Sequence, residues 1–182
     1  MTILHLDASI NGKNSASRAI SKSIVEQIKG VQSDKVTYRD LAAEPLPHLT
    51  LGAFADSSVV DEFLAADTVV IGAPMYNFTL PTQLKAWIDR IVLAGITFRY
   101  TENGPEGLAK GKRVIIALAR GGFYNQASPA AALEHLETYL RGVFNFIGIE
   151  PEFVAADGLN ISPEQREESI KQALGESVRL AA

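Results

Sequence analysis

Two hydrophobic patterns alternate along the chain. Short runs rich in β-branched residues, bounded by turn residues, occupy residues 2–8, 67–73, 113–119 and 150–156. The runs at 67–73 and 113–119 are apolar nearly throughout, which is typical of strands that are covered on both faces. Residues 35–40 alternate between apolar and polar positions and favour an edge strand. The pattern therefore predicts five strands.

Between the strands, apolar positions recur every three or four residues, which predicts helices. One helix follows Ser17, with Gly30 as its stop, and another lies between Pro81 and Gly95. Residues 57–66 form a shorter helix. The apolar faces of the first two helices are Ile20, Ile24 and Ile28, and then Leu84, Trp87, Ile88 and Ile91.

Two further helices are expected in the second half of the chain. One opens at Ser128-Pro129, and the last opens with the letters SPEQ at residues 162–165, a capping box with proline in the first turn. Their apolar faces are Leu133, Leu136, Leu140, Val143 and Ile147, and then Ile170, Ala173, Leu174 and Val178.

Strands that alternate with helices predict a single α/β domain over residues 1–182, with a parallel sheet and helices on both faces. In such a fold, ligands bind beyond the carboxyl ends of the strands, where the strand order reverses. Three junctions therefore become candidates for a binding site, directly after Ala8, Ala73 and Ala119.

Charge and composition narrow the class of partner. The net charge is −4, without a run of Lys or Arg, so we expect no nucleic-acid partner. The absence of cysteine excludes disulfides and thiol chemistry. The N-terminus lacks the features of a signal peptide and no apolar run reaches spanning length, so we expect a cytoplasmic protein without membrane attachment. His5, His48 and His135 have no metal-like or triad-like neighbours in the sequence, so we expect neither a metal site nor a catalytic side chain.

The first junction carries hydroxyl groups at the start of a helix. Ser9, Ser15 and Ser17 lie there, without a Rossmann fingerprint or a P-loop. Free backbone N–H groups and the partial positive charge of a helix start bind phosphate, and hydroxyls add donors. The alternative is a polar turn in which Ser17 is an ordinary N-cap.

The other two junctions fit a flat ligand. Met75, Tyr76 and Phe78 offer a surface for a heteroaromatic ring, and the backbone N–H groups of Asn77 and Phe78 can meet its polar edge. The alternative is a small hydrophobic cluster under a loop. After the strand at 113–119, paired glycines permit a close approach of the backbone to a ligand, or else supply a turn with positive φ.

Taken together, a phosphate cradle, an aromatic slot and a bare backbone edge correspond to the parts of flavin mononucleotide (FMN). The letters PMYNF, TQLKAWID, GITFRYTENGPEGL and RGG resemble the FMN-dependent NADH:quinone oxidoreductases, also called FMN-dependent NADH-azoreductases, of the flavodoxin-like superfamily. The resemblance runs from the first strand to the last helix. It implies a three-layer sandwich whose five-stranded parallel sheet has the order 2-1-3-4-5.

The resemblance also implies roles for individual residues around a noncovalent FMN. The phosphate would be held by Ser9, Ser15, Ala16 and Ser17; the ring would be lined by Met75, Tyr76, Asn77 and Phe78; and its edge would be bordered by Ala119, Arg120, Gly121 and Gly122. The family implies a homodimer in which each pocket borrows side chains from the partner. On that basis Tyr100 and Phe146 are expected to line the substrate pocket.

The implied activity is transfer of two electrons from NADH to quinones, and reductive cleavage of azo compounds. One exposed flavin face would serve donor and acceptor in turn, which predicts ping-pong kinetics. Two departures from the family concern Ala16, where a longer polar residue is common, and the short segment 47–59, where longer members place a loop over the flavin. The alternatives are a flavodoxin-type electron carrier that does not oxidise NADH by itself, and a flavin-free interaction module on the same fold.

Overall fold

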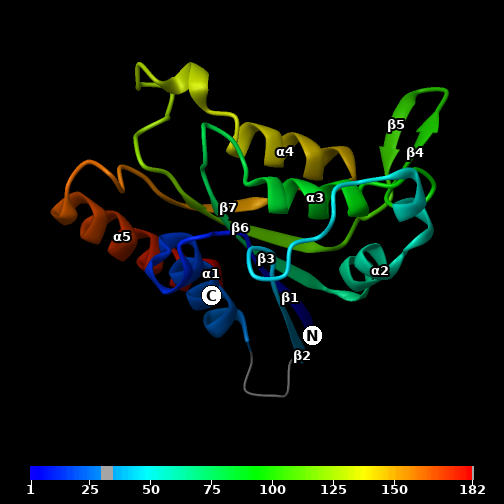
Figure 1. The fold of residues 1–182 in the computed structure, drawn as a ribbon, viewed down its shortest axis with the longest axis horizontal. Helices are drawn as coiled ribbons and strands as arrows, with labels where there is room; N and C mark the ends of the chain where they lie inside the picture. The colour runs from blue at the N-terminus through cyan, green and yellow to red at the C-terminus, as the bar shows by residue number, and fades with distance from the viewer. Residues whose placement is uncertain (30–34, 182) are drawn as a thin grey trace.

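The fold is built on a five-stranded parallel sheet. In this computed structural model, which describes residues 1–29 and 35–181, the strand order is β2-β1-β3-β6-β7 (Figure 1). This is the predicted order 2-1-3-4-5, since β4 and β5 form a separate hairpin. The predicted helix stop at Gly30 lies outside the described residues. The strands are β1 (Thr2–Asp7), β2 (Lys35–Asp40), β3 (Thr68–Pro74), β6 (Arg113–Ala119) and β7 (Glu152–Ala156).

Helices cover both faces of the sheet, as predicted. On one face α1 (Ala16–Ile28) and α5 (Pro163–Ala181) pack over Ile3, Val70 and Ile115. On the other face α2 (Ser58–Ala65), α3 (Thr82–Ile91) and α4 (Glu137–Phe146) enclose a larger cluster (Figure 1). No helix in the described part of the chain has the length and apolar character needed to cross a membrane.

The predicted start of α4 was wrong. Ser128-Pro129 opens a turn followed by a short 3-10 helix, η3 (Ala131–Leu133), and α4 begins only at Glu137. The cause is the carboxylate of Glu134. It accepts hydrogen bonds from the backbone N–H groups of Leu136, Glu137 and Thr138 at 2.8–3.1 Å, and thus satisfies the free donors at a helix start.

The predicted apolar face of α5 needs one correction. Val178 is 51% exposed, whereas Ser177 is fully buried. Ser177 faces α1, where its hydroxyl lies 3.0 Å from the hydroxyl of Ser23 and donates to the carbonyl of Leu174. The contact between the two helices uses a small hydroxyl side chain at this position, so the valine that follows points to solvent.

The sequence FRYTENGPEG forms an antiparallel hairpin of β4 (Phe98–Thr101) and β5 (Gly104–Gly107). In Figure 1 the hairpin lies beyond the ends of α3 and α4, on the opposite side of the molecule from the start of α1. The backbone at Gly107, at the end of β5, packs directly against the backbone of Gly148. A Cβ at position 107 would lie 2.1 Å from the backbone nitrogen of Gly148, so this position requires glycine.

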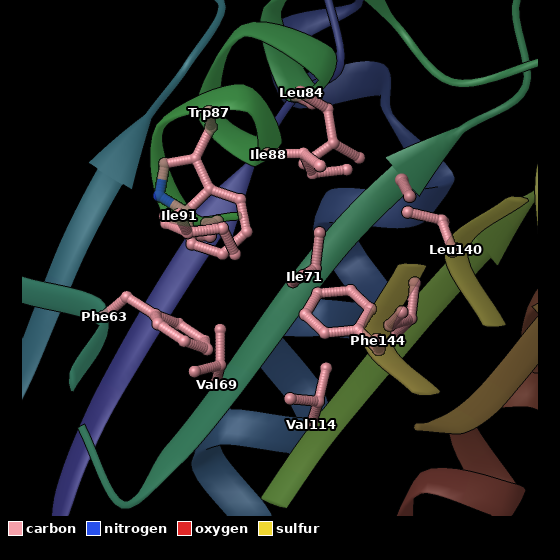
Figure 2. Close-up of a cluster of buried hydrophobic side chains, with 14 of the residues drawn as sticks. Phe63, Val69, Ile71, Leu84, Trp87, Ile88, Ile91, Val114, Leu140 and Phe144 are labelled. Carbon is pink, nitrogen blue, oxygen red and sulfur yellow. The ribbon is translucent and has the colours of Figure 1, made fainter. Parts of the chain in front are cut away.

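The larger core cluster contains the most voluminous buried side chains. Phe63 of α2 meets Trp87 of α3 edge-on at 5.9 Å, and Phe144 of α4 belongs to the same cluster as Ile71 and Val114 of the sheet (Figure 2). Phe144 is 0% exposed.

We expect Phe144→Ala to lower the free energy of unfolding by about 3–5 kcal/mol, because the truncation leaves a cavity between α4 and the sheet. Chemical denaturation followed by circular dichroism measures the change. Phe54→Ala is the matched control, since Phe54 is 54% exposed and should cost far less. Equal losses in the two variants would contradict the assignment of Phe144 to the core.

Candidate functional site

The three predicted junctions meet in one small cavity. Its volume is about 160 Å³, and it lies at the carboxyl ends of β1, β3 and β6. The predicted residues that line it are Ser9, Ser15, Ala16, Met75, Tyr76, Ala119 and Gly121. Sequence reasoning missed the remaining lining residues, which are Asn11, Asn14, Pro74, Leu159, Asn160 and Arg166.

Ser15 caps α1. Its hydroxyl accepts a hydrogen bond from the backbone N–H of Arg18 at 3.3 Å, so the helix begins at Ala16. Within residues 1–29 and 35–181, the N–H groups of Ala16 and Ser17 have no hydrogen-bond partner. Ser17 was wrongly considered as the N-cap: it is fully buried, its hydroxyl lies 3.1 Å from that of Ser15, and it does not line the cavity. The helix start thus offers one hydroxyl and two free amides.

Tyr76 joins the first junction to the second. Its hydroxyl accepts a hydrogen bond from the backbone N–H of Ile10 at 3.1 Å and lies 3.3 Å from the hydroxyl of Ser9. The aromatic ring is therefore held at both ends, by its own backbone and by the loop after β1.

The segment after β3 turns through two residues with a left-handed backbone. Asn77 has φ of 47° and Phe78 has φ of 72°, and Tyr76 and Thr79 exchange two backbone hydrogen bonds of 2.9 and 3.1 Å around them. Positive φ at both central positions is the geometry of a type I′ turn, in which glycine usually takes the second position. Phenylalanine there stores about 1–3 kcal/mol of strain, and such strain gathers at binding sites.

Phe78 also remains 43% exposed. Its carbonyl accepts a hydrogen bond from the N–H of His135 at 3.0 Å, and its ring meets Tyr124 edge-on. In the described part of the chain the N–H groups of Asn77 and Phe78 have no partner. The turn thus presents an aromatic ring and two free donors on the surface beside the cavity.

Arg120 does not line the cavity, although its neighbours Ala119 and Gly121 do. Its guanidinium is turned away, with the carboxylates of Asp157 at 2.6 Å, Glu137 at 3.3 Å and Glu134 at 3.6 Å. Burial alone would lower the pKa of Arg120, but the hydrogen bonds and charges of these carboxylates outweigh burial and raise the pKa. The side chain therefore fastens α4 and the end of β7 to the third junction.

The two glycines after Arg120 have different roles. Neither has a positive φ, so the alternative of a left-handed turn at this position was wrong. A Cβ on Gly121 would lie 2.5 Å from the side-chain amide nitrogen of Asn160, so a larger residue here would displace the exposed side chain of Asn160. A Cβ on Gly122 would touch only Tyr124, at 3.4 Å, and Gly122 does not line the cavity.

The end of β7 supplies a fourth side of the site, which the sequence analysis did not consider. The N–H groups of Leu159 and Asn160 donate to the carbonyls of Arg120 and Gly121 at 3.1 and 3.0 Å. The rule that ligands bind at the carboxyl ends of strands applies equally to β7 and could have indicated this segment.

Tyr100 and Phe146 do not reach the cavity of their own chain. Tyr100 lies on the hairpin and is 75% exposed. Phe146, at the end of α4, packs against Phe98 at 4.6 Å. The hairpin that carries Tyr100 lies on the opposite side of the molecule from the start of α1 (Figure 1), and the contact with Phe98 joins Phe146 to the same hairpin.

A charged network supports the loop after β1. The guanidinium of Arg18 donates two hydrogen bonds to the carbonyl of Ser9, at 2.7 and 3.2 Å, and two to the carboxylate of Asp40, both at 2.7 Å. The hydrogen bonds from Arg18 lower the pKa of Asp40. The position of Ser9 is thus tied to the edge strand β2.

Behind Arg18 lies a hydrogen-bonded group of titratable side chains, of which His5 and Asp7 are buried and Tyr38 is exposed. The carboxylate of Asp7 accepts hydrogen bonds from the hydroxyls of Ser21 at 2.8 Å and Tyr38 at 3.1 Å, and the Nε2 atom of His5 lies 3.0 Å from the Ser21 hydroxyl. Burial lowers the pKa of His5, although the charge of Asp7 opposes this shift. Burial also raises the pKa of Tyr38 to about 12. His5, Asp7 and Tyr38 line a separate groove of about 710 Å³ between α1 and β2.

The donor set of the cavity suits part of a nucleotide. Hydroxyls, free amides and one arginine are groups that bind a phosphate. A volume of about 160 Å³ is below the 300–1,000 Å³ of most small-molecule pockets, so only the phosphate end fits inside. A flat ring would continue over Met75 and Tyr76 toward the exposed Phe78. The residues present therefore fit FMN with its ring near the surface.

The chain is similar along nearly its whole length to a known protein family and to named bacterial relatives. A family model described as the flavodoxin-like fold matches residues 1–180. A protein of Bradyrhizobium diazoefficiens named FMN-dependent NADH:quinone oxidoreductase 2 is 51% identical over 201 residues, which cover 100% of both chains. An FMN-dependent NADH:quinone oxidoreductase of Rhizobium meliloti is 54% identical over 193 residues, covering 95% of this chain and 93% of the relative.

Solved structures of azoreductases are similar in fold. An azoreductase from Bacillus anthracis aligns with a TM-score of 0.90 at 29% identity, covering 100% of this chain and 98% of that chain. An FMN-dependent NADH-azoreductase from the same species, in complex with FMN, aligns with a TM-score of 0.85 at 26% identity, covering 100% and 99%.

Because the pKa of His5 is lowered in the folded protein, we expect stability to fall with pH below 6.5, the ordinary value. In that range the unfolded chain binds a proton that folded His5 does not, so acid favours unfolding. Urea titrations between about pH 5 and 7.5 measure the effect. The variant His5→Gln should lose this part of the slope, and His48→Gln, which alters an exposed residue, should keep it. An unchanged slope in His5→Gln would refute the assignment.

Proposed function

The chain belongs to the family of FMN-dependent NADH:quinone oxidoreductases, and we propose from this premise that it binds FMN noncovalently and passes two electrons from NADH to quinones. The observation that carries the proposal is the meeting of free donors and aromatic surface at one place. The capped start of α1, the strained turn at Asn77-Phe78 and the backbone at Gly121 all border one cavity or its rim.

Bound FMN would supply the redox chemistry, taking a hydride from NADH and giving two electrons to the acceptor. The chain's own residues bind the cofactor and orient its ring. Ser9, Ser15 and the amides of Ala16 and Ser17 hold the phosphate, and Met75 and Tyr76 support the ring.

Free backbone N–H donors near the ring would stabilise negative charge on the reduced cofactor. In the described residues, the N–H groups of Asn77, Phe78, Gly121 and Gly122 have no hydrogen-bond partner. Preorganised donors of this kind stabilise negative charge that develops during a reaction. We therefore assign no acid, base or nucleophile among the side chains. Gly122 offers only its backbone N–H, and Arg120 acts indirectly, by holding the third junction through its carboxylate partners.

We extend the proposal to azo compounds as acceptors. Residues 47–59 contribute nothing to the cavity lining, and Leu51, on the short helix η2 (Leu51–Ala55), is 90% exposed. The Bradyrhizobium match extends over 201 residues against 182 here, so that relative contains segments that this chain lacks. A short 47–59 segment leaves the acceptor side open to bulky molecules.

A homodimer would complete the site. One chain encloses only the phosphate end, while the exposed Phe78 and Tyr100 lie on different parts of its surface. In the dimer, the partner's Tyr100 and the partner's Phe146 would close over the ring. This arrangement explains why aromatics of the FRYTENG segment lie far from the cavity of their own chain.

We expect the purified protein to be yellow and to release FMN, not FAD, on acid precipitation. Initial rates across NADH and menadione concentrations should give parallel double-reciprocal lines, because both substrates use one face in turn. Boiled protein and protein stripped of flavin are the controls.

Intersecting lines would contradict the shared face. A yellow protein that oxidises NADH only when a separate reductase is added would be an electron carrier, and a colourless protein that takes up no FMN would overturn the proposal.

Complementation tests the dimer. Gly121→Val should abolish FMN binding, because a branched side chain at this cavity-lining position would displace Asn160 and occupy space meant for the ligand, and Tyr100→Ala should bind FMN but reduce quinone poorly. When the two variants are mixed and allowed to exchange subunits, activity should return. One pocket of each mixed dimer then combines an intact FMN site from one subunit with an intact Tyr100 from the other. Sedimentation of the wild type should give twice 19.6 kDa. A monomer, or a mixture no more active than its parts, would refute the shared pocket.

A further inference from the structure

Arg166 is the one cationic side chain that lines the cavity in the described part of the chain. It lies in the first turn of α5, and its Nη2 atom donates a hydrogen bond to the carbonyl of Asn14 at 2.9 Å. Asn14 and its neighbour Ser15 also line the cavity. The guanidinium therefore crosses from the last helix to the loop that presents the phosphate donors.

The backbone that carries Arg166 is fixed on both sides. The hydroxyl of Ser162 accepts a hydrogen bond from the N–H of Gln165 at 3.2 Å, which caps α5. One turn further on, the hydroxyl of Ser169 donates to the carbonyl of Asp157 at 2.7 Å. Asn160 is bonded through its N–H to Gly121, so the whole start of α5 is held against the third junction.

The charge of Arg166 is uncommitted. Arg18 and Arg120, which hold the loops at the first and third junctions, are both paired with carboxylates at 2.6–2.7 Å. Among the described residues no carboxylate lies within ion-pair distance of Arg166, and the carbonyl of Asn14 occupies only one of its five N–H donors. The remaining donors are available to a ligand in the cavity.

A phosphate monoester carries a charge of about −1.5 to −2 at neutral pH. Ser9, Ser15 and the amides of α1 are neutral, so they leave this charge uncompensated. We propose, on the basis of the proposed function, that Arg166 is an FMN-binding residue whose guanidinium pairs with the phosphate while it holds the carbonyl of Asn14. Asn160 orients the backbone beside it.

The competing explanation is a structural staple, in which Arg166 only holds the loop at Asn14. The two roles differ in their response to the phosphate. A phosphate ligand discriminates FMN from riboflavin, which has the same ring and ribityl chain without the phosphate. A staple affects both flavins equally.

The experiment compares the dissociation constants of FMN and riboflavin for the flavin-stripped protein by fluorescence quenching. We expect Arg166→Gln to weaken FMN binding about ten- to a hundredfold and to change riboflavin binding less than about twofold. Arg166→Lys, which keeps the charge, should lie between wild type and Arg166→Gln. Lys171→Gln is the matched control, because it removes one positive charge from an exposed position on the same helix.

Added salt gives a second measurement that does not depend on riboflavin. FMN affinity of the wild type should fall more steeply with sodium chloride than that of Arg166→Gln, since one charge pair is missing in the variant. Equal losses for FMN and riboflavin, or equal salt slopes, would overturn the proposal in favour of the staple. A wild type that binds neither flavin would refute the proposed function itself, whereas normal FMN binding in Arg166→Gln would refute only the role of Arg166.

Discussion

The site depends on hydrogen bonding that continues past the ends of the parallel strands. Ala8 donates to the carbonyl of Gly72 at 3.1 Å, Met75 to Ala119 at 2.8 Å, and Arg120 to Ala156 at 2.9 Å. Each bond joins the first residues of one junction to the neighbouring strand. Parallel pairing fixes the register of the strands, so the loops that follow start at the same edge and cannot shift independently.

This constraint explains how the charges are used. Arg18 and Arg120 form ion pairs with carboxylates that hold the loops, so in the described part of the chain the cavity is lined by hydroxyls and amides with Arg166 as its one cation. Neutral donors fixed by a rigid backbone bind an anion without the desolvation cost of burying another unpaired cation. Fixed hydrogen bonds also explain the strained backbone at Asn77 and Phe78. The two backbone hydrogen bonds between Tyr76 and Thr79 hold the turn in this conformation.

The sheet and most helices were predictable because their apolar periods are imposed by burial on one or both faces. The failures occurred where a side-chain hydrogen bond, within a turn or between two helices, decided the outcome. The start of α4 depends on the carboxylate of Glu134, and the face of α5 depends on small side chains of α1 that meet Ser177. The cap of α1 was placed two residues late because Ser15 and Ser17 are chemically equivalent in the sequence. Arg166 carried no local signal, since its role arises only where α5 meets Asn14.

Two arginines near the third junction, Arg120 and Arg166, have different roles: one stabilises the fold and the other is available to bind a ligand. Removal of Arg120 would take the shared cation from Asp157 and Glu134, whereas Glu137 would keep its ion pair with Arg141, and the loss of this cation would destabilise the fold around the third junction. Arg166 has no such carboxylates, so its loss leaves no buried charge behind. The same residue type therefore carries stability on one side of the junction and is free to serve a ligand on the other. Affinity for an anion can change at Arg166 while the strand ends that build the site stay in place.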